Sequence, residues 1–249
     1  MLELVLVLLA GVAAGALNAV GGGGTFVALP ALVALGLPPV TANALSRIAL
    51  VPGAAASAWV YRRELVPVGK TSTRSLTVVS AVGGGVGAAL LLALPASSFD
   101  VVAPWLLAFA TAVLAFGRQL SQKLGRAVAM GPRAVLVAQF FLAVYGGYFG
   151  GAVGILMLAL WSIGVGLDAA TGNPMRVTQL AAIFMSATVL FLIASDALRT
   201  PLILTAMLAG AVLGGFAGAH VARRIPARLL RAIILTTAVT MTVLYFLRG

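Results

Sequence analysis

The chain has 249 residues, of which 62% are hydrophobic and 8% are charged, and its mean hydropathy is +1.14. A soluble domain averages about 45–50% apolar and about 25% charged residues, so the composition excludes a soluble protein and predicts an integral membrane protein. The net charge of +11 falls in short basic clusters between apolar runs, which indicates membrane topology and argues against a nucleic-acid partner. The chain has no cysteine, which excludes a disulfide or a thiolate metal site.

Apolar segments follow one another along the chain, and most reach the roughly 17–25 residues that a membrane-spanning helix needs. They are residues 2–20, 25–37, 44–61, 75–94, 101–117, 134–149, 155–167, 175–194, 202–222 and 229–247. Segments 25–37 and 155–167 hold 13 residues each. At about 1.5 Å per residue they are too short for a hydrocarbon core of about 30 Å. Each follows a glycine-rich break, VGGGGT or YGGYFGGAVG, so we expect half-helices there.

An ungapped shift of 130 residues aligns the two halves of the chain. The aligned pairs include Gly21 with Gly151, Gly24 with Gly154, Gly36 with Gly166, Thr41 with Thr171, and Asn43 with Asn173. Chance explains matching glycines easily, but it explains poorly a Gly-Leu pair followed by Thr-x-Asn at identical spacing. We therefore predict a duplicated helical repeat, with a first membrane repeat at 1–117, a basic cytoplasmic linker at 118–132 and a second membrane repeat at 133–249.

The basic clusters at 62–74, 118–133 and 223–231 mark cytoplasmic loops by the positive-inside rule. The loops around Asp100 and around Asp196 carry little positive charge and are expected outside. If residues 134–167 crossed the membrane once, the third basic cluster would lie outside. The conflict disappears if this region enters, breaks at its glycines and returns, and the same geometry in the first copy makes the two copies an inverted repeat. A single long, broken crossing in each copy is the alternative.

The glycine breaks are followed by polar clusters, TANALSR at 41–47 and TGNPMRVTQ at 171–179. Glycine lets the backbone leave the helix, and non-helical backbone at membrane depth must be buried in protein or line a polar cavity. The N–H groups at the half-helix ends would then favour an anion. Thr41 or Asn43, and Thr171 or Asn173, are expected as helix N-caps. The alternative is that the glycines only allow close helix packing, which we favour for 83–87.

Arg47 and Arg176 each lie near the start of a predicted spanning helix. A guanidinium inside a membrane segment costs about 2.5–3.5 kcal/mol on insertion scales unless it reaches the interface, water or a partner. Snorkelling to the interface and anion binding are both consistent with the sequence. Arg176 is the first choice for pairing with an anion, whereas Arg47 is left as a ligand, a gate or an interfacial anchor. Trp59, Trp105 and Trp161 are expected as interfacial anchors.

The predicted substrate site lies where the two breaks converge near the pseudo-two-fold axis. No catalytic residue, metal ligand or cofactor is predicted. The candidate substrate-binding residues are Asn18, Gly22, Gly23, Gly24, Thr25, Asn43, Ser46, Arg47, Tyr148, Gly151, Gly154, Asn173, Arg176, Thr178 and Gln179.

Three stretches, NAVGGGGTFVALPALVALGLPPVTANA, ALVPGAAASAWVYRRELVP and YGGYFGGAVGILMLALWSIG, resemble the sulfite exporter TauE/SafE family of bacterial membrane permeases, also called the toluene sulfonate uptake permease family. The resemblance spans essentially the whole chain. It implies a duplicated inner-membrane transporter for sulfite, organosulfonates or related small anions, with proton coupling. The family pattern Asn-Ala-Thr-Asn-Thr reads Asn-Ala-Leu-Ser-Arg at 43–47 here, so Arg47 is gained. The pattern Asn-Ala-Leu-Lys-Asn reads Asn-Pro-Met-Arg-Val at 173–177, so Arg176 replaces a lysine.

The sequence thus predicts a multi-pass permease of the bacterial inner (cell) membrane, secondary-active, for a small anion such as sulfite or an organosulfonate, and not an enzyme. Its predicted partners are the lipid bilayer and the small anionic substrate, and a homo-oligomer is left open. The alternative function is a non-transporting membrane assembly or scaffold component, in which the repeat serves only the architecture.

Overall fold

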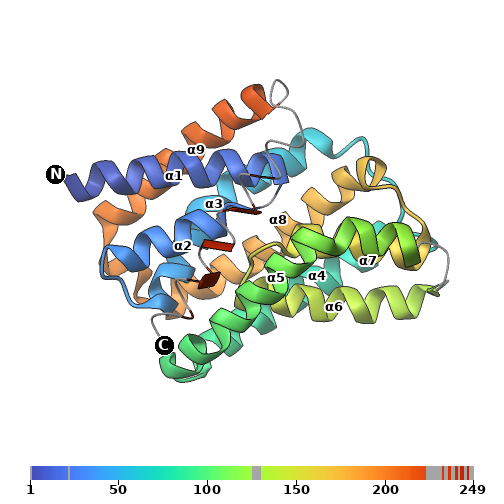
Figure 1. Cartoon of the computed structure of the whole chain (residues 1–249), viewed down its shortest axis with the longest axis horizontal. Coiled ribbons are helices and arrows are strands. Elements are labelled where there is room, and N and C mark those ends of the chain that lie inside the picture. Colours follow the sequence, from blue (N-terminus) through green and yellow to red (C-terminus); the bar gives the residue numbers. More distant parts are fainter. Residues whose placement is uncertain are drawn as a thin grey trace.

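A computed structural model of the chain describes residues 2–21, 23–124, 130–222, 232, 235–236, 239–240, 242–243 and 246. The described part is all-helical and has no β-strand. Its elements are α1 (Leu2–Gly21), α2 (Thr25–Ala34), α3 (Pro39–Tyr61), α4 (Thr73–Ala93), α5 (Ala96–Leu124), α6 (Pro132–Tyr148), α7 (Val153–Val165), α8 (Ala169–Ala194), the 3₁₀ helix η1 (Asp196–Arg199) and α9 (Pro201–Ala222) (Figure 1).

Both glycine-rich segments interrupt the helical path, as the sequence predicts. α1 ends at Gly21 and α2 starts at Thr25, while α6 ends at Tyr148 and α7 starts at Val153. α2 has 10 residues and α7 has 13. At about 1.5 Å per residue these helices are about 15 and 20 Å long, which is shorter than a hydrocarbon core of about 30 Å. They are therefore half-helices by length.

The predicted N-caps of the two helices that follow are wrong. α3 starts at Pro39 after Pro38, and no side chain caps it, because proline at the first position has no N–H group to satisfy. α8 is capped by Asp168, whose Oδ2 accepts hydrogen bonds from the backbone N–H groups of Ala170 (2.9 Å) and Thr171 (3.3 Å). The polar clusters therefore lie inside the first turns of the helices, where their side chains are available for other contacts.

The helices pack in reciprocal pairs between the two halves of the chain. α1 lies against α9, α6 lies against α4, and α3 lies against α8 at the centre of the molecule (Figure 1). Small residues make these approaches close: a Cβ on Gly147 would collide with the carbonyl of Gly84, and one on Gly214 with the carbonyl of Val12. The glycines of α4 thus serve helix packing, as expected from the sequence.

The first helices of the two halves, α1 and α6, start at opposite ends of the molecule. The start of α1 lies at one end of the long axis, and α6 starts near the other end (Figure 1). The predicted linker at 118–132 overlaps the end of α5, which continues to Leu124. Near the other end of the linker, the Met130 N–H donates to the Gly164 carbonyl at 2.8 Å. The predicted basic cluster at 223–231 lies outside the described residues.

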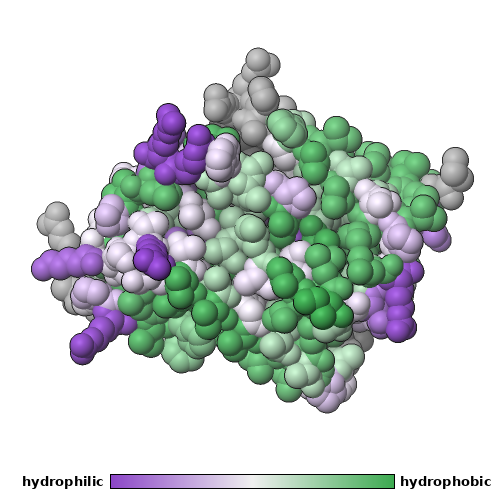
Figure 2. Space-filling model, turned by 180° about the vertical axis from the view of Figure 1, so that it is seen from behind, coloured by the Kyte–Doolittle hydropathy of each residue, from purple (hydrophilic) through white to green (hydrophobic). Residues whose placement is uncertain are grey.

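The outer surface matches a lipid-facing protein. Apolar residues cover the middle of the molecule and hydrophilic residues gather toward the ends of its long axis (Figure 2). Three described helices are long and apolar enough to cross a membrane, at Thr73–Ala93, Ala96–Val113 and Ala170–Ala194. α3 is 23 residues long but is not one of them, because Arg47 lowers its hydropathy.

The three tryptophans do not share one location. Trp59 and Trp105 are exposed, which is consistent with interfacial anchors, but Trp161 is buried. The expectation for Trp161 is therefore wrong. It lies on the half-helix α7, which is enclosed by the rest of the chain, and its indole N–H has no hydrogen-bond partner.

Candidate functional site

The second break, between α6 and α7, has an irregular backbone. Gly150 has φ +79° and Ala152 has φ +57°, so two residues lie in the left-handed region that favours glycine. The Tyr145 hydroxyl bridges the turn by donating to the Gly151 carbonyl at 2.8 Å. α7 then starts at Val153 with no side-chain cap. The Ile155 N–H donates to the Ala152 carbonyl at 2.9 Å, which leaves the N–H groups of Val153 and Gly154 for another acceptor.

The first break, between α1 and α2, leaves buried polar atoms unpaired. α2 starts at Thr25 without a side-chain cap, and the Thr25 hydroxyl is buried without a hydrogen-bond partner. The Oδ1 atom of Asn18 is also buried and unpartnered, and the side chain of Asn18 lies against Gly24. Gly23 and Gly24 are buried, whereas the predicted ligand Gly22 lies outside the described residues.

The structure brings the two breaks together. A Cβ on Gly151 would lie 3.3 Å from Cε1 of Phe26, in the first turn of α2. A Cβ on Gly24 would lie 3.1 Å from Cδ1 of Leu50, one turn beyond Arg47 on α3. The start of the half-helix α2 therefore contacts the non-helical turn between α6 and α7.

Arg47 crosses from α3 to the second break. Its Nη1 donates to the Gly146 carbonyl, its guanidinium lies 5.0 Å from the centre of the Phe184 ring, and it fills the space where Gly150 would carry a Cβ. The side chain is 0% exposed, and its Nε and Nη2 atoms have no hydrogen-bond partner. Arg47 therefore does not reach the membrane interface, which removes the snorkelling alternative for this residue.

Asn43 and Ser46 lie on the same buried face of α3. Asn43 Nδ2 donates to the Tyr148 carbonyl at 2.8 Å, while its Oδ1 is buried and unpartnered. Ser46 donates to the Asn43 carbonyl at 2.8 Å. Of the predicted ligands, Tyr148 takes part here through its backbone, and its ring packs 5.9 Å from the ring of Phe99. α3 thus holds the last turn of α6 through Asn43 and Arg47.

Arg176 approaches the second break from α8. Its Nε donates to Oδ1 of Asn173 at 2.9 Å, and its Nη1 would lie 2.9 Å from a Cβ on Gly154, in the first turn of α7. The side chain is 3% exposed, and its two terminal nitrogens have no hydrogen-bond partner. Arg176 therefore presents free donors close to the uncapped N-terminus of α7.

The other two predicted ligands on α8 point elsewhere. Thr178 donates to the Pro174 carbonyl of its own helix at 3.1 Å. Gln179 donates to the Thr77 hydroxyl of α4 at 3.0 Å, and its Oε1 is buried without a partner. These hydrogen bonds lie within α8 and between α8 and α4, and not at the two breaks.

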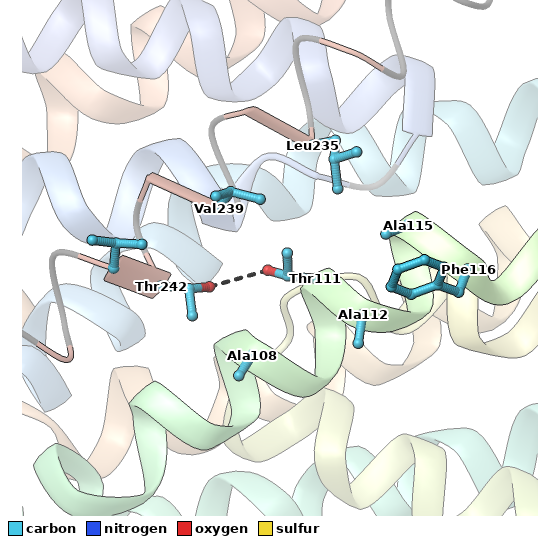
Figure 3. A pocket seen from close by; sticks show the side chains of 9 residues that line it. Ala108, Thr111, Ala112, Ala115, Phe116, Leu235, Val239 and Thr242 are labelled. Atoms are coloured by element: carbon cyan, nitrogen blue, oxygen red, sulfur yellow. Dashed lines mark hydrogen bonds between the residues drawn. The ribbon is translucent and has the colours of Figure 1, made fainter.

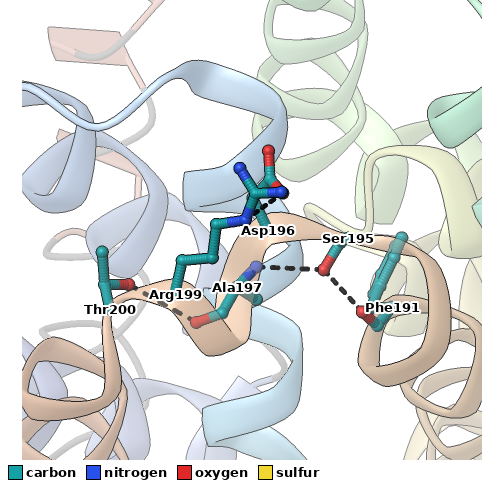
Figure 4. Close-up of polar contacts among 6 residues, drawn as sticks. All are labelled: Phe191, Ser195, Asp196, Ala197, Arg199 and Thr200. Atoms are coloured by element: carbon teal, nitrogen blue, oxygen red, sulfur yellow. Dashed lines mark hydrogen bonds and ion pairs between the residues drawn. The ribbon is translucent and has the colours of Figure 1, made fainter.

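The buried arginines have no acidic partner in the described part of the chain. The acids whose side chains are described, Glu3, Glu64, Asp168 and Asp196, are all exposed. Asp196 pairs with Arg199 of the same 3₁₀ turn at 3.0 Å, next to the hydrogen bonds of Ser195 and Thr200 (Figure 4). Two buried cations therefore remain without an ionic partner, and no cluster of acids or histidines among these residues could hold a metal ion.

A pocket of about 380 Å³ lies between α5 and described positions of the C-terminal segment, where Thr111 and Thr242 form a 3.1 Å hydrogen bond (Figure 3). Its lining residues are Ala108, Thr111, Ala112, Ala115, Phe116, Leu235, Val239, Thr242 and Val243. None of them is charged, so this pocket offers no charge-assisted hydrogen bond to an anion. It is a weaker candidate site than the contact between the breaks.

Two polar residues of α6 were not predicted as site residues. Tyr145 is one, and its hydroxyl bridges the turn at Gly151. Gln139 is 0% exposed on α6 and donates to Ser80 at 2.9 Å, with its Oε1 unpartnered. In the sequence, Gln139 is the single amide within the apolar run AVLVAQFFLAV. Because a polar side chain inside a membrane segment costs free energy, this position could have been singled out.

One family of known proteins matches the chain over most of its length. The family model described as sulfite exporter TauE/SafE matches residues 7–245, which is nearly the whole chain. No curated protein and no solved structure matches the chain. On the extent of the family match, the chain belongs to the sulfite exporter TauE/SafE family of membrane transporters.

Proposed function

We propose that the protein is a secondary-active permease for a small oxyanion such as sulfite or an organosulfonate, and that the anion binds where the two helix breaks meet. The observation that carries this proposal is the pair of buried arginines with unpaired N–H groups and no acidic partner among the described residues. A guanidinium in a membrane segment is costly unless a partner or water compensates it. An anion supplies the missing negative charge for both arginines and accepts hydrogen bonds from Arg176.

The backbone adds to this preference for an anion. α7 starts beside Arg176 with no side-chain cap, so its free N–H groups and the positive end of its dipole act on the same space. Planar guanidinium groups match the oxygens of trigonal and tetrahedral oxyanions. We assign Arg176 as the direct ligand and Asn173 as the residue that orients it.

We assign the first copy the supporting hydrogen bonds. Oδ1 of Asn18, the hydroxyl of Thr25 and Oδ1 of Asn43 are buried and unpaired, so they can accept from a protonated oxygen or an amino group of the substrate. Gly23, Gly24, Gly151 and Gly154 let the backbone come close to it. Ser46, Thr178 and Gln179 have protein partners already, and we assign them to holding α3 and α8.

We further propose that the two halves, 1–117 and 133–249, are inverted membrane repeats joined by the basic linker. Support comes from the reciprocal pairing of α1 with α9 and of α6 with α4, and from the opposite ends at which α1 and α6 start. Inverted repeats bring their broken helices together at one central site, and rocking of one repeat against the other gives alternating access. A bacterial inner-membrane location follows from the family resemblance.

Two measurements on the purified protein test this function. In a thermal-shift screen with sulfite, sulfate, thiosulfate, sulfoacetate, taurine and carboxylates, at least one anion should raise the unfolding temperature, because a ligand of the native state stabilises it. Proteoliposomes should then take up that anion with saturable kinetics, and an imposed pH gradient shows whether protons drive uptake. A membrane scaffold predicts no saturable uptake of any oxyanion, and that result would reject the proposal.

A further inference from the structure

We propose that Arg47 makes the site selective for doubly charged anions over singly charged anions of the same shape. The inference rests on the proposed function and concerns which anions the site prefers. Its basis is that Arg47 and Arg176 face the same helix break as two separate positive charges, with no acid among the described residues to neutralise either of them.

The two guanidinium groups bracket one short piece of backbone. Arg47 fills the space beside Gly150, and Arg176 lies beside Gly154. Four residues of chain span at most about 14 Å, so the two glycine Cα atoms are no farther apart than that. A small anion at the start of α7 is therefore within the field of both charges.

The two arginines differ in how an anion can use them. Arg176 keeps free donors and a small exposed surface, whereas Arg47 is completely buried, with one nitrogen bound to the Gly146 carbonyl and the others enclosed. In this conformation Arg47 acts through its charge and not through direct contact. The free energy that Arg47 contributes to anion binding is proportional to the charge of the anion, whereas a contribution from packing or shape does not depend on that charge.

The expected size follows from Coulomb's law. If about 10 Å separates Arg47 from the anion and the effective dielectric constant is about 20, each unit of negative charge on the anion raises its affinity roughly tenfold. A dianion gains roughly a hundredfold on the same basis. Removing the Arg47 charge should therefore lower the preference for a dianion over a matched monoanion by roughly tenfold.

The experiment compares anions of equal shape and different charge on the full chain in detergent. Sulfate and perchlorate are both tetrahedral and carry two charges and one, and selenate and perrhenate form a second tetrahedral pair with two charges and one. Affinities are measured by calorimetry or thermal shift for the parent protein, Arg47→Gln and Arg47→Lys. The dianion-to-monoanion affinity ratio is compared between proteins, because differences in anion hydration then cancel.

Arg62→Gln is the matched control. Arg62 follows directly after α3 and lies exposed, 4.1 Å from the centre of the Trp59 ring. Its substitution removes the same charge from the residue that follows α3, but at the surface, where solvent screens it. The affinity ratio should remain at the parent value in this variant.

We expect Arg47→Gln to lower the ratio by roughly tenfold and Arg47→Lys, which keeps the charge, to retain most of it. An equal loss of affinity for both members of each pair would show that Arg47 only supports the fold, and it would overturn the inference while leaving the anion permease intact. An unchanged ratio in Arg47→Gln would do the same. If the parent binds none of the anions of either charge, the proposed function itself fails.

Discussion

The two helix breaks occupy equivalent positions in the two halves of the chain, but the structure uses them differently. At the first break Gly24 keeps a helical backbone with φ −57°, and the surrounding polar atoms are left unpaired. At the second break two residues have positive φ, and Tyr145, Asn43, Arg47 and Arg176 all contact it or its flanking turns. The two breaks thus lie at matching positions of the sequence, while a few side chains concentrate the charge at the second break.

The largest effect is expected from Gly150→Ala. Alanine at φ +79° costs about 1–2 kcal/mol, and its Cβ collides with the Arg47 guanidinium, for which overpacking adds about 1–3 kcal/mol. Gly36→Ala is the matched control, because Gly36 also has positive φ but has open space around it. Denaturant unfolding in detergent should show a clearly larger loss for Gly150→Ala. Equal losses at the two glycines would mean that Arg47 does not fill the second break.

Arg176→Gln should follow in size. Loss of a charge-assisted hydrogen bond typically costs about 1.5–3 kcal/mol, or roughly ten- to a hundredfold in anion affinity. Arg133→Gln, at an exposed position in the first turn of α6, is the control and should bind as the parent does. Calorimetric titration with the anion identified in the screen measures both variants. If Arg176→Gln binds as tightly as the parent at equal abundance, Arg176 is a structural residue and the assigned ligand is wrong.

The helices that follow the breaks provide a smaller contrast. Asp168 caps α8 through two backbone N–H groups, whereas α3 starts at a proline and has no side-chain cap. Asp168→Ala should therefore lower the unfolding free energy by about 1 kcal/mol, the usual cost of losing an N-cap. Thr41→Ala, near the start of α3, should change it by less than about half of that. A larger loss of unfolding free energy for Thr41→Ala would contradict the structure and support the N-cap of α3 that the sequence predicts.

Tyr145→Phe should have the smallest effect. It removes the hydroxyl that donates to the Gly151 carbonyl, a bond whose net contribution is about 0.5–1.5 kcal/mol. Because this bond bridges the turn before α7, hydrogen exchange should speed up at residues 149–152 more than in α1 and α2. Uniformly faster exchange along the whole chain would contradict a local role for the hydroxyl.

The positions of the breaks and of the half-helices follow from local sequence. Glycine runs cannot continue a helix, and the two short apolar segments cannot cross a membrane, so their positions could be predicted without tertiary information. The burial of polar clusters beside the breaks follows from the rule that unpaired backbone must be enclosed in protein. The role of the individual site residues stays a prediction.

Two features depend on tertiary packing and could not be predicted from the sequence. Arg47 and Arg176 both lie near helix starts, and only the packing of α6 and α8 against α3 decides that Arg47 is enclosed by Gly146, Gly150 and Phe184. Trp161 is buried because its half-helix is covered, which its position near a helix end does not reveal. The cap of α8, by contrast, is a local contact: Asp168 directly before the helix caps it, and not Thr171 or Asn173 as the sequence predicts.

The central claim is that one anion binds where the two breaks meet, and anomalous scattering from bound selenate tests it most directly. Selenate has the shape and charge of sulfate, and its selenium is located independently of the protein, since a chain with ordinary methionine contains no other selenium. The account predicts a peak beside Gly154, next to Arg176 and the first turn of α7, which is lost in Arg176→Gln. A peak confined to exposed arginines, or to the pocket between α5 and the C-terminal segment, would contradict it.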